Sequence, residues 1–255
     1  MNKILTAALS LGTAALPSFT FAQSIPVPTL KPGDTWTYVD TVETGPNGWR
    51  QTRDQVSVER ITSDHIYLET QPSGGTQAPR ELILGADWSR SRSVNGTDTV
   101  INRPLAFPLS VGKTWTVKYV ESHPNPQLAT RSFETHYKVV GPESVTVPGG
   151  KFDAIKIEAE GVWTAETAPR QSVTSGMSHD GSGSTIVVQN RNGGPVELTG
   201  KTYKAFWYSP AVGRWVKSVE EEYDTNGIRN SRYTGELASY RRADSVDNAA
   251  SAPQQ

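Results

Sequence analysis

The sequence has 255 residues, of which 35% are hydrophobic and 20% are charged, with 22 Gly and 17 Pro. Its formal net charge is −1, so the clustered basic surface that attracts nucleic acid or an anionic membrane is not expected. No Cys is present, which excludes disulfides and a lipid anchor attached to a Cys. Such a chain is long enough for one large or two small β domains with frequent turns.

The first 22 residues have the features of a secretory signal peptide. Lys3 supplies a positive start, residues 4–16 are apolar, Pro17 ends this stretch, and Ala22 is a small residue before a cut. A buried N-terminal helix is the alternative, whereas a membrane span would need about 20 apolar residues. We therefore expect residues 1–22 to be removed and the mature protein to be periplasmic or secreted, without a membrane span.

Strand-like segments alternate with turn signals from about residue 34 to residue 240. In residues 35–43, Trp36, Tyr38 and Val42 fall on one side of a strand, and residues 51–60 repeat the two-residue alternation. Asn-Gly pairs suit two-residue hairpin turns, because both central residues of a type I′ turn need positive φ. Four such pairs predict hairpins, at residues 47–48, 95–96, 192–193 and 226–227.

Two further turns use proline. Residues 147–150, Val-Pro-Gly-Gly, favour a type II turn. In residues 209–213, Pro210 opens a type I turn and Gly213 can take the left-handed bulge position. The segments on either side of this second turn predict a hairpin rich in aromatic side chains.

No stretch of twelve residues after the leader shows a helical period, so the predicted class is all-β. We expect a large curved antiparallel sheet, arranged as a sandwich or a half-open barrel of many short hairpin strands. It would form a single domain over residues 23–243. Residues 172–184 are rich in Ser and Gly and predict a mobile loop, and residues 244–255 predict a disordered tail.

A weak repeat relates residues 30–37 to residues 109–116. Both segments place Leu, Gly and then Thr-Trp-Thr in the same order, with an aromatic residue shortly afterwards. Two related halves meeting near residues 104–110 would explain this repeat, and coincidence in a chain rich in Thr and Trp is the alternative.

The search for reactive groups finds no convincing constellation. The four His residues are far apart and form no metal-binding pattern. Ser178, His179 and Asp180 have the residue types of a hydrolase triad, but neighbours on an extended chain point in opposite directions. Glu158 and Glu160, like the acidic run at residues 220–222, are explained by a solvated sheet face. No cofactor, metal or catalytic residue is predicted.

Aromatic residues are the remaining candidates for a binding site. They could line an apolar cavity between curved sheets, with an arginine offering a charged contact at its rim. A packed core with an ion pair at the arginine is the alternative. The predicted ligand-binding residues are Trp36, Trp115, Trp207, Tyr208, Arg214 and Trp215.

Three segments together resemble a family of exported bacterial β-proteins of unknown function, some of which are called TapB-like. They are residues 107–115, 147–157 and 206–217, and the resemblance extends over about residues 30–223. It implies a curved antiparallel structure in the cell envelope, akin to the LolA-like lipoprotein carriers. Because the matching positions are mostly turns and core residues, the resemblance implies no activity.

Three functions remain open on the sequence. The leading hypothesis is a non-catalytic periplasmic binding or carrier module for an apolar or amphipathic ligand, such as a lipid. The second is a structural or interaction protein that contacts an envelope protein through exposed strand edges. The third, less favoured, is a hydrolase that uses dispersed carboxylates.

Overall fold

The structure, a computed structural model, describes residues 24–45, 48–180 and 183–243, and of residues 170–193 it describes the backbone only. Within these ranges the chain forms strands and turns and no α-helix, so the predicted all-β class is confirmed. No helix there has the length and hydropathy needed to cross a membrane. The strands are β1 (Thr35–Glu43), β2 (Trp49–Ile61), β3 (His65–Pro72), β4 (Arg80–Gly85), β5 (Arg90–Val94), β6 (Thr97–Asn102), β7 (Thr114–Asn125), β8 (Leu128–Val147), β9 (Gly150–Thr167), β10 (Arg170–Asp180), β11 (Gly183–Gly193), β12 (Glu197–Ser209), β13 (Arg214–Tyr223) and β14 (Arg229–Arg241).

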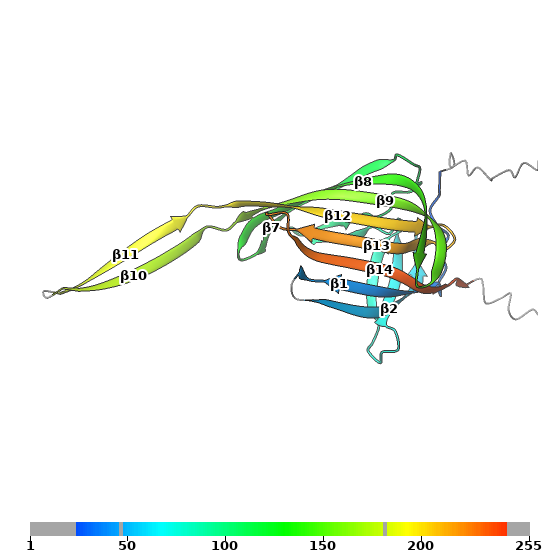
Figure 1. The fold of residues 1–255 in the computed structure, drawn as a ribbon, viewed down its shortest axis with the longest axis horizontal. Helices are drawn as coiled ribbons and strands as arrows, with labels where there is room; N and C mark the ends of the chain where they lie inside the picture. The colour runs from blue at the N-terminus through cyan, green and yellow to red at the C-terminus, as the bar shows by residue number, and fades with distance from the viewer. Residues whose placement is uncertain (1–23, 46–47, 181–182, 244–255) are drawn as a thin grey trace, which may run out of the picture.

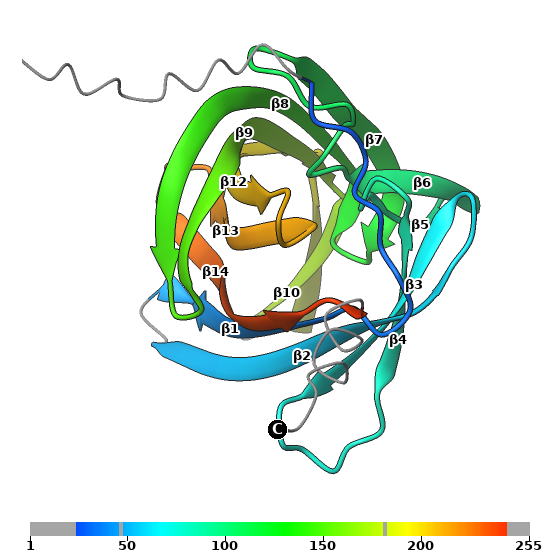
Figure 2. The same ribbon diagram turned by 90° about the vertical axis from the view of Figure 1, so that its right-hand side faces the viewer.

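Ten strands form one antiparallel sheet in the order β4-β3-β2-β1-β14-β13-β12-β9-β8-β7. Most pairs in this sheet join chain neighbours; the exceptions are β9 with β12, which flank the β10–β11 segment in the chain, and β1 with β14, which joins the N-terminal and C-terminal series. The sheet curls strongly, as Figure 2 shows end-on, but its outer strands β4 and β7 do not pair. The short β5–β6 hairpin lies between these two edges and contacts both. The predicted large curved sheet is therefore confirmed, in its half-open form.

The β5–β6 hairpin covers the free edge of β7 with side chains. The Asn95 amide group donates from Nδ2 to the Val120 carbonyl oxygen (2.9 Å) and accepts at Oδ1 from the Ser122 backbone N–H (2.9 Å). Arg92 and Glu121 add a bidentate ion pair with both distances 2.7 Å, and the hydrogen bonds from Arg92 lower the pKa of Glu121. The Asn95 side-chain amide thus makes two of the hydrogen bonds that a neighbouring strand would otherwise make with β7.

Alternation along β1 and β2 gives the concave side of the sheet its apolar lining. Trp36 and Tyr38 are buried on β1, and Val56 and Val58 are buried on the facing part of β2. Residues two apart share one face of a strand, so the predicted pattern of these two strands is confirmed. Their burial removes large apolar areas from water, which is the main force that holds the sheet in its curl.

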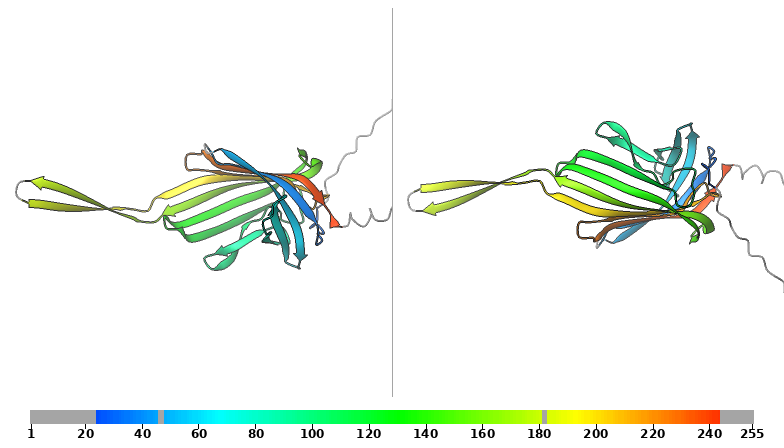
Figure 3. Two further views of the ribbon diagram at one scale, coloured as in Figure 1. Left: turned by 90° about the horizontal axis from the view of Figure 1, so that it is seen from below. Right: turned by 90° about the horizontal axis from the view of Figure 1, so that it is seen from above.

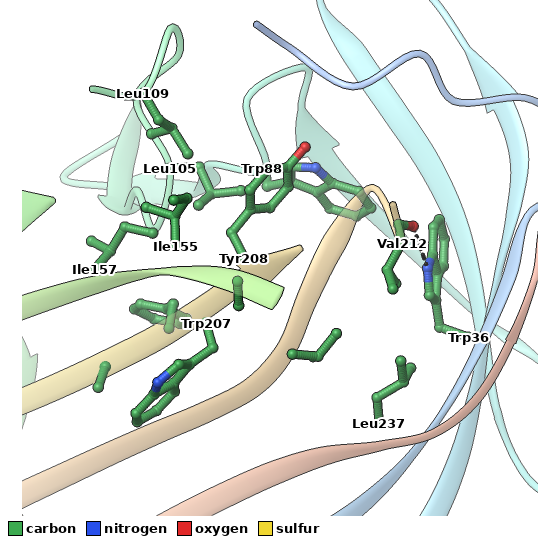
Figure 4. Close-up of a cluster of buried hydrophobic side chains, with 14 of the residues drawn as sticks. Trp36, Trp88, Leu105, Leu109, Ile155, Ile157, Trp207, Tyr208, Val212 and Leu237 are labelled. Atoms are coloured by element: carbon green, nitrogen blue, oxygen red, sulfur yellow. Dashed lines mark hydrogen bonds between the residues drawn. The ribbon is translucent and has the colours of Figure 1, made fainter. Parts of the chain in front are cut away.

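At one end of the sheet the β12–β13 hairpin turns inward. Residues 205–209 are all buried, in place of the usual alternation, because both faces of this hairpin lie inside the molecule. The tip of β8–β9 passes outside it and reaches β14, where the Gly149 backbone N–H donates to the Leu237 carbonyl oxygen (2.8 Å). Figure 2 shows the β12–β13 tip inside the arc of β8 and β9. We call this region the closed end; its largest buried side chains include Trp36, Trp88, Leu105, Leu109, Tyr208 and Leu237 (Figure 4).

The segment predicted as a mobile loop forms a two-stranded ribbon instead. β10 pairs with β11 from Arg170 opposite Gly193 to Asp180 opposite Gly183, and the ribbon extends away from the main sheet (Figures 1 and 3). The prediction was wrong because small polar residues reduce burial but leave the backbone ladder free to form. The side chains of Ser178, His179 and Asp180 lie outside the described part, so the triad residues stay untested.

Most of the predicted turns are found, with some differences in type. Asn95 (φ 51°) and Gly96 (φ 81°) form the two-residue turn expected of an Asn-Gly pair. The Ser209 carbonyl accepts from the Val212 and Gly213 N–H groups, and Gly213 has φ 75°, as the bulge requires.

The other predicted turns depart from the expected form. Residues 226–227 do lie in the turn between β13 and β14, but only Gly227, and not Asn226, has the positive φ that a type I′ turn needs at both positions. Residues 192–193 lie at the end of β11 rather than in a turn, and residue 47 is outside the described part. Residues 148–149 do link β8 to β9, but the positive φ of 124° belongs to Gly150.

The two Thr-Trp-Thr segments have the same local geometry. The backbone N–H groups of Gly33 and Gly112 donate to the carbonyl oxygens of Val58 and Val139, respectively, at 2.8 and 2.9 Å. Both glycines have positive φ, of 91° and 84°, which favours Gly at each position. The first segment leads into a central strand and the second into an edge strand, so a relation between two halves stays a prediction.

Candidate functional site

The aromatic candidates on β1 and β12 belong to the core of the closed end. Trp36 is 0% exposed, and its indole N–H donates to the Val212 carbonyl oxygen over 3.1 Å. Its ring meets that of Trp88 edge-on, with centroids 5.7 Å apart, and Tyr208 is also fully enclosed. Figure 4 shows these side chains gathered around the β12–β13 turn. These residues therefore lie in tight packing and line no cavity described below.

Trp207 and Trp115 contact other parts of the same hydrophobic core. Trp207 is buried between Lys156 and Lys217, whose ammonium groups lie 5.3 and 5.9 Å from its ring centroid. Trp115 is half-buried on β7 and stacks on Tyr137, with ring centroids 5.3 Å apart and an interplanar angle of 7°. The structure thus disperses the predicted aromatic set over more than one place.

Arg214 is held in a cage of four aromatic rings. Its guanidinium carbon lies 4.7–5.4 Å from the ring centroids of Trp36, Tyr38, Trp88 and Trp215. The residue is 6% exposed, and its Nε and Nη1 atoms have no hydrogen-bond partner among the described residues. Cation–π attraction stabilises the charge but leaves these N–H groups without an acceptor. Three predicted residues, Trp36, Arg214 and Trp215, are therefore brought together, around a buried cation.

A cavity of about 270 Å³ lies further along the same strands, and we call it the chamber. Val42, which borders it, shares one strand face with Trp36 and Tyr38, so the chamber is on the concave side of the sheet. Strands β1, β6, β7, β8, β12, β13 and β14 all contribute to it. Its lining includes Val42, Ile101, Tyr119, Phe133, Thr135, Thr202, Lys204, Glu220, Glu222, Ser231 and Tyr233.

One wall of the chamber is polar. Lys204 Nζ forms an ion pair with Glu220 (2.9 Å) across the β12–β13 ladder and also donates to Asn102 Oδ1 (3.4 Å). The same Asn102 oxygen accepts from the Tyr137 hydroxyl over 2.7 Å. This network orders four polar side chains from separate strands and places charged groups at the cavity.

Another part of the chamber lining is aromatic. Tyr119 and Phe133 stack with centroids 5.0 Å apart and an interplanar angle of 24°. The Arg131 guanidinium lies 4.7 Å from the Phe133 centroid and pairs with Glu222 over 3.0 Å. A cavity bordered by a stacked aromatic pair and by paired charges suits a molecule that has both apolar and polar parts.

Trp163, on β9, is positioned next to this aromatic lining by a glycine on the neighbouring strand. A Cβ atom added to Gly200 would lie 2.6 Å from the Trp163 ring and 2.3 Å from the Tyr223 carbonyl oxygen. The Trp163 indole N–H donates to that same oxygen over 3.1 Å. Only glycine leaves room for the ring to lie across β12 and to reach β13.

A polar cluster lies on the concave side between the chamber and the closed end. The Tyr233 hydroxyl donates to Asp40 Oδ1 over 2.6 Å. A Cβ added to Gly235 would lie 2.8–3.0 Å from the Tyr233 hydroxyl, from Asp40 Oδ1 and from Ser218 Oγ, so glycine keeps this space open. Burial raises the pKa of Asp40, while the nearby charge of Arg214 acts in the opposite direction.

The acidic residues considered from the sequence fall on both faces of the sheet. Glu158 pairs with Lys156 (2.7 Å) on the outer side, and this hydrogen-bonded pair lowers the pKa of the Glu158 carboxyl. Glu220 and Glu222 border the chamber on β13, each with a cationic partner. Carboxylates already paired with cations suit binding better than the proton transfer of glycoside hydrolysis.

Three larger cavities lie elsewhere on the described part of the molecule. One of about 760 Å³ is bordered by His136, Glu160 and Lys201, and by the turn between β13 and β14. A second, about 540 Å³, is bordered by Ile25, the proline-containing part of β8 at residues 142–144, and Pro210. The third, about 460 Å³, is bordered by residues within 41–45 and 48–51 at the β1–β2 turn. None of the three combines stacked rings with paired charges, so the chamber is the candidate functional site.

The chamber residues were missed by the sequence analysis. Lys204 and Glu220 each look like solvated strand positions, and nothing local marks them as inward-facing. The available signal was alternation: Lys204 is two residues before the buried Phe206 and therefore shares its face. Using that signal also required the knowledge that β12 lies beside β13 and β9 in the sheet.

Comparison with known sequences gives no match, either to a protein-family model or to a curated protein. Among solved structures, the chain is similar to a protein assigned as exported, with a YmcC-like fold, from Bacteroides fragilis (TM-score 0.40, 13% identity, 86% of this chain and 100% of that chain). It is also similar to a protein assigned as a lipoprotein from Parabacteroides distasonis (0.40, 15%, 86% and 100%). The third is the hypothetical lipoprotein YmcC from Escherichia coli (0.36, 11%, 88% and 92%). At these TM-scores the likeness carries no argument about function.

Proposed function

We propose that this protein is a non-catalytic binding module of the bacterial cell envelope that holds an amphipathic ligand in the chamber. The observation that carries the proposal is the meeting of two unlike walls in one cavity. The stacked rings of Tyr119 and Phe133 and the Lys204–Glu220 ion pair border the same cavity of about 270 Å³. Ligand sites typically combine apolar walls with a few placed polar groups.

The size of the chamber limits the ligand. Pockets for drug-sized molecules usually measure about 300–1,000 Å³. At about 270 Å³ the chamber therefore suits a small amphipathic molecule, or one end of a longer molecule whose remainder stays outside. The location in the envelope rests on the predicted signal peptide, and the resemblance to TapB-like proteins and LolA-like carriers agrees with it.

A tryptophan introduced into the chamber should abolish ligand binding if the ligand occupies the chamber. Ser231 borders the chamber on β14, whereas Ser239 is exposed on the same strand. We expect native mass spectrometry, after incubation with extracted envelope lipids, to show a bound species on the wild-type protein and on Ser239→Trp. Ser231→Trp should lose that species because the indole occupies the cavity. Absence of any bound species on the wild type, or equal retention by both variants, contradicts the proposal.

The projecting ribbon favours a second candidate, a protein that contacts an envelope partner. β10 and β11 pair along their whole length and extend beyond the main sheet (Figure 1). A two-stranded ribbon alone buries little and gains stability when another surface covers it. Crosslinking in cells from a photoreactive residue at position 175 should give a specific protein adduct. If only the uncrosslinked chain is recovered, this candidate is removed.

A further inference from the structure

Arg214 is a buried cation with two nitrogen atoms that make no hydrogen bond to the described residues. It is 6% exposed, and its Nε and Nη1 atoms are buried without a partner in the part of the chain that the structure describes. No carboxylate there forms an ion pair with it; the Asp40 carboxyl, whose pKa its charge affects, is bonded to Tyr233. A guanidinium stays charged in proteins, so this arrangement is costly unless something else supplies an acceptor.

The aromatic cage explains why the charge is tolerated but not why it is there. Four rings within 4.7–5.4 Å attract the cation, each by a modest amount. Rings accept N–H groups only weakly, whereas a carboxylate or phosphate accepts two of them in a planar fork. An apolar side chain of similar length would fill the same space at lower cost, so the arginine points to an anionic group that binds there.

The polar cluster connects this arginine to the chamber. The Tyr233 ring borders the chamber, and its hydroxyl reaches Asp40 over 2.6 Å. Ser218 Oγ lies beside the same two groups, over the backbone of Gly235. Ser218 and Arg214 are on β13 together, and the charge of Arg214 lowers the pKa of both Asp40 and Tyr233 against the effect of burial. Tyr233 thus belongs to both the chamber lining and the polar cluster, and Ser218 of that cluster is on the same strand as Arg214.

We propose that Arg214 receives the anionic head group, a carboxylate or a phosphate, of the amphipathic ligand whose apolar part lies in the chamber. This inference rests on the proposed function and deepens it by naming the class of ligand. Ser218, which lies beside the Tyr233–Asp40 hydrogen bond on the same strand as Arg214, supplies a further hydroxyl donor. The aromatic cage then serves to hold the guanidinium in place before the ligand arrives.

The experiment compares decanoate, decyl phosphate and decanol, which share a chain and differ in the head group. Binding is measured by isothermal titration calorimetry to the wild-type protein, Arg214→Met and Arg214→Lys. We expect the wild type to bind at least one anion more tightly than the alcohol. Arg214→Met should weaken the binding of that anion by about tenfold or more, as for a lost charge-assisted hydrogen bond, and should leave the affinity for decanol unchanged. Arg214→Lys should retain part of the preference.

Thermal unfolding of the ligand-free protein distinguishes a binding role of Arg214 from a structural one, because loss of a structural arginine would lower the Tm. Because Arg214→Met removes a buried charge without a partner, its Tm should equal or exceed that of the wild type. Equal binding of anions and alcohol by the wild type overturns the inference and leaves the proposed function standing. Binding of none of the three compounds counts against both. A lower Tm for Arg214→Met with unchanged anion binding shows a structural arginine and also overturns it.

Discussion

The closed end and the chamber lie on the same concave face of the same strands, yet they are built from different residues. At the closed end, β1 and β12 contribute Trp36 and Tyr208, both fully enclosed. In the chamber, β12 and β13 contribute Lys204 and Glu220, which form an ion pair beside an open space. The difference teaches that one curved sheet has two kinds of interior along its length: a packed apolar core at the closed end, and a cavity lined by paired charges in the chamber.

Truncation at the closed end should give the largest effect. Trp36→Ala removes a fully buried indole and its hydrogen bond to Val212, so the free energy of unfolding should fall by about 3–5 kcal/mol. Ser231→Ala, which alters only the chamber lining, serves as the matched variant and should change stability little. Urea unfolding followed by circular dichroism measures both. Equal losses for the two variants would remove the distinction between the regions.

A smaller loss of folding stability is expected when a methyl group fills the space that the Trp163 ring occupies. In Gly200→Ala the new methyl group would meet the Trp163 ring and the Tyr223 carbonyl, and overpacking of this kind typically costs about 1–3 kcal/mol. Gly194→Ala is the control, because a Cβ there has open space around it. The same unfolding measurement applies. An unchanged Gly200→Ala variant would show that Trp163 is free to move.

The polar cluster should make stability depend on pH. Burial raises the pKa of Asp40 in the folded protein above its unfolded value, so its contribution is most favourable at low pH and is lost as pH rises through the folded pKa. Asp40→Asn keeps an acceptor for Tyr233 and removes the titration. It should therefore raise the free energy of unfolding more at pH 8 than at pH 4. The difference between the two pH values should be smaller than the loss caused by Gly200→Ala. A difference between variant and wild type that is the same at both pH values contradicts this.

The smallest effect is expected where charges are exposed. The Arg92–Glu121 pair is close (2.7 Å), but 39% of the Arg92 side chain is exposed. Arg92→Ala should lower stability by about 0.2–1 kcal/mol, and added salt should reduce the difference. Arg90→Ala, at an exposed position on the same strand, should be neutral. A loss for Arg92→Ala that salt does not reduce would indicate that packing, not charge, is responsible.

The sequence predicted the closed end better than the chamber, for a physical reason. Burial of Trp36 and Val58 follows from two-residue alternation within a single strand, and the Asn95–Gly96 turn follows from local φ requirements. The chamber depends on which strands are neighbours, because Lys204 meets Glu220 only when β12 pairs with β13 at that register. Pairing across the β1–β14 junction, which brings Tyr233 to Asp40, has no local signature at all.

Two predictions differ from the structure because local sequence does not determine strand pairing: the loop predicted at residues 172–184, in β10 and β11, and the surroundings predicted for Arg214. Small polar residues suggested a loop, but backbone pairing decided the outcome. Arg214 was expected at a rim or in an ion pair, whereas the inward turn of the β12–β13 hairpin places it among four rings. The position of this hairpin inside the molecule depends on distant strands, because the tip of β8–β9 passes outside it and bonds to β14.

The amide of Asn95 has a consequence for how molecules of this protein meet one another. It occupies the Val120 carbonyl and the Ser122 N–H, two of the groups through which a second chain could pair with β7. Exposed sheet edges invite edge-to-edge association of chains. A single short side chain at a hairpin turn thus hinders such association at this part of the β7 edge.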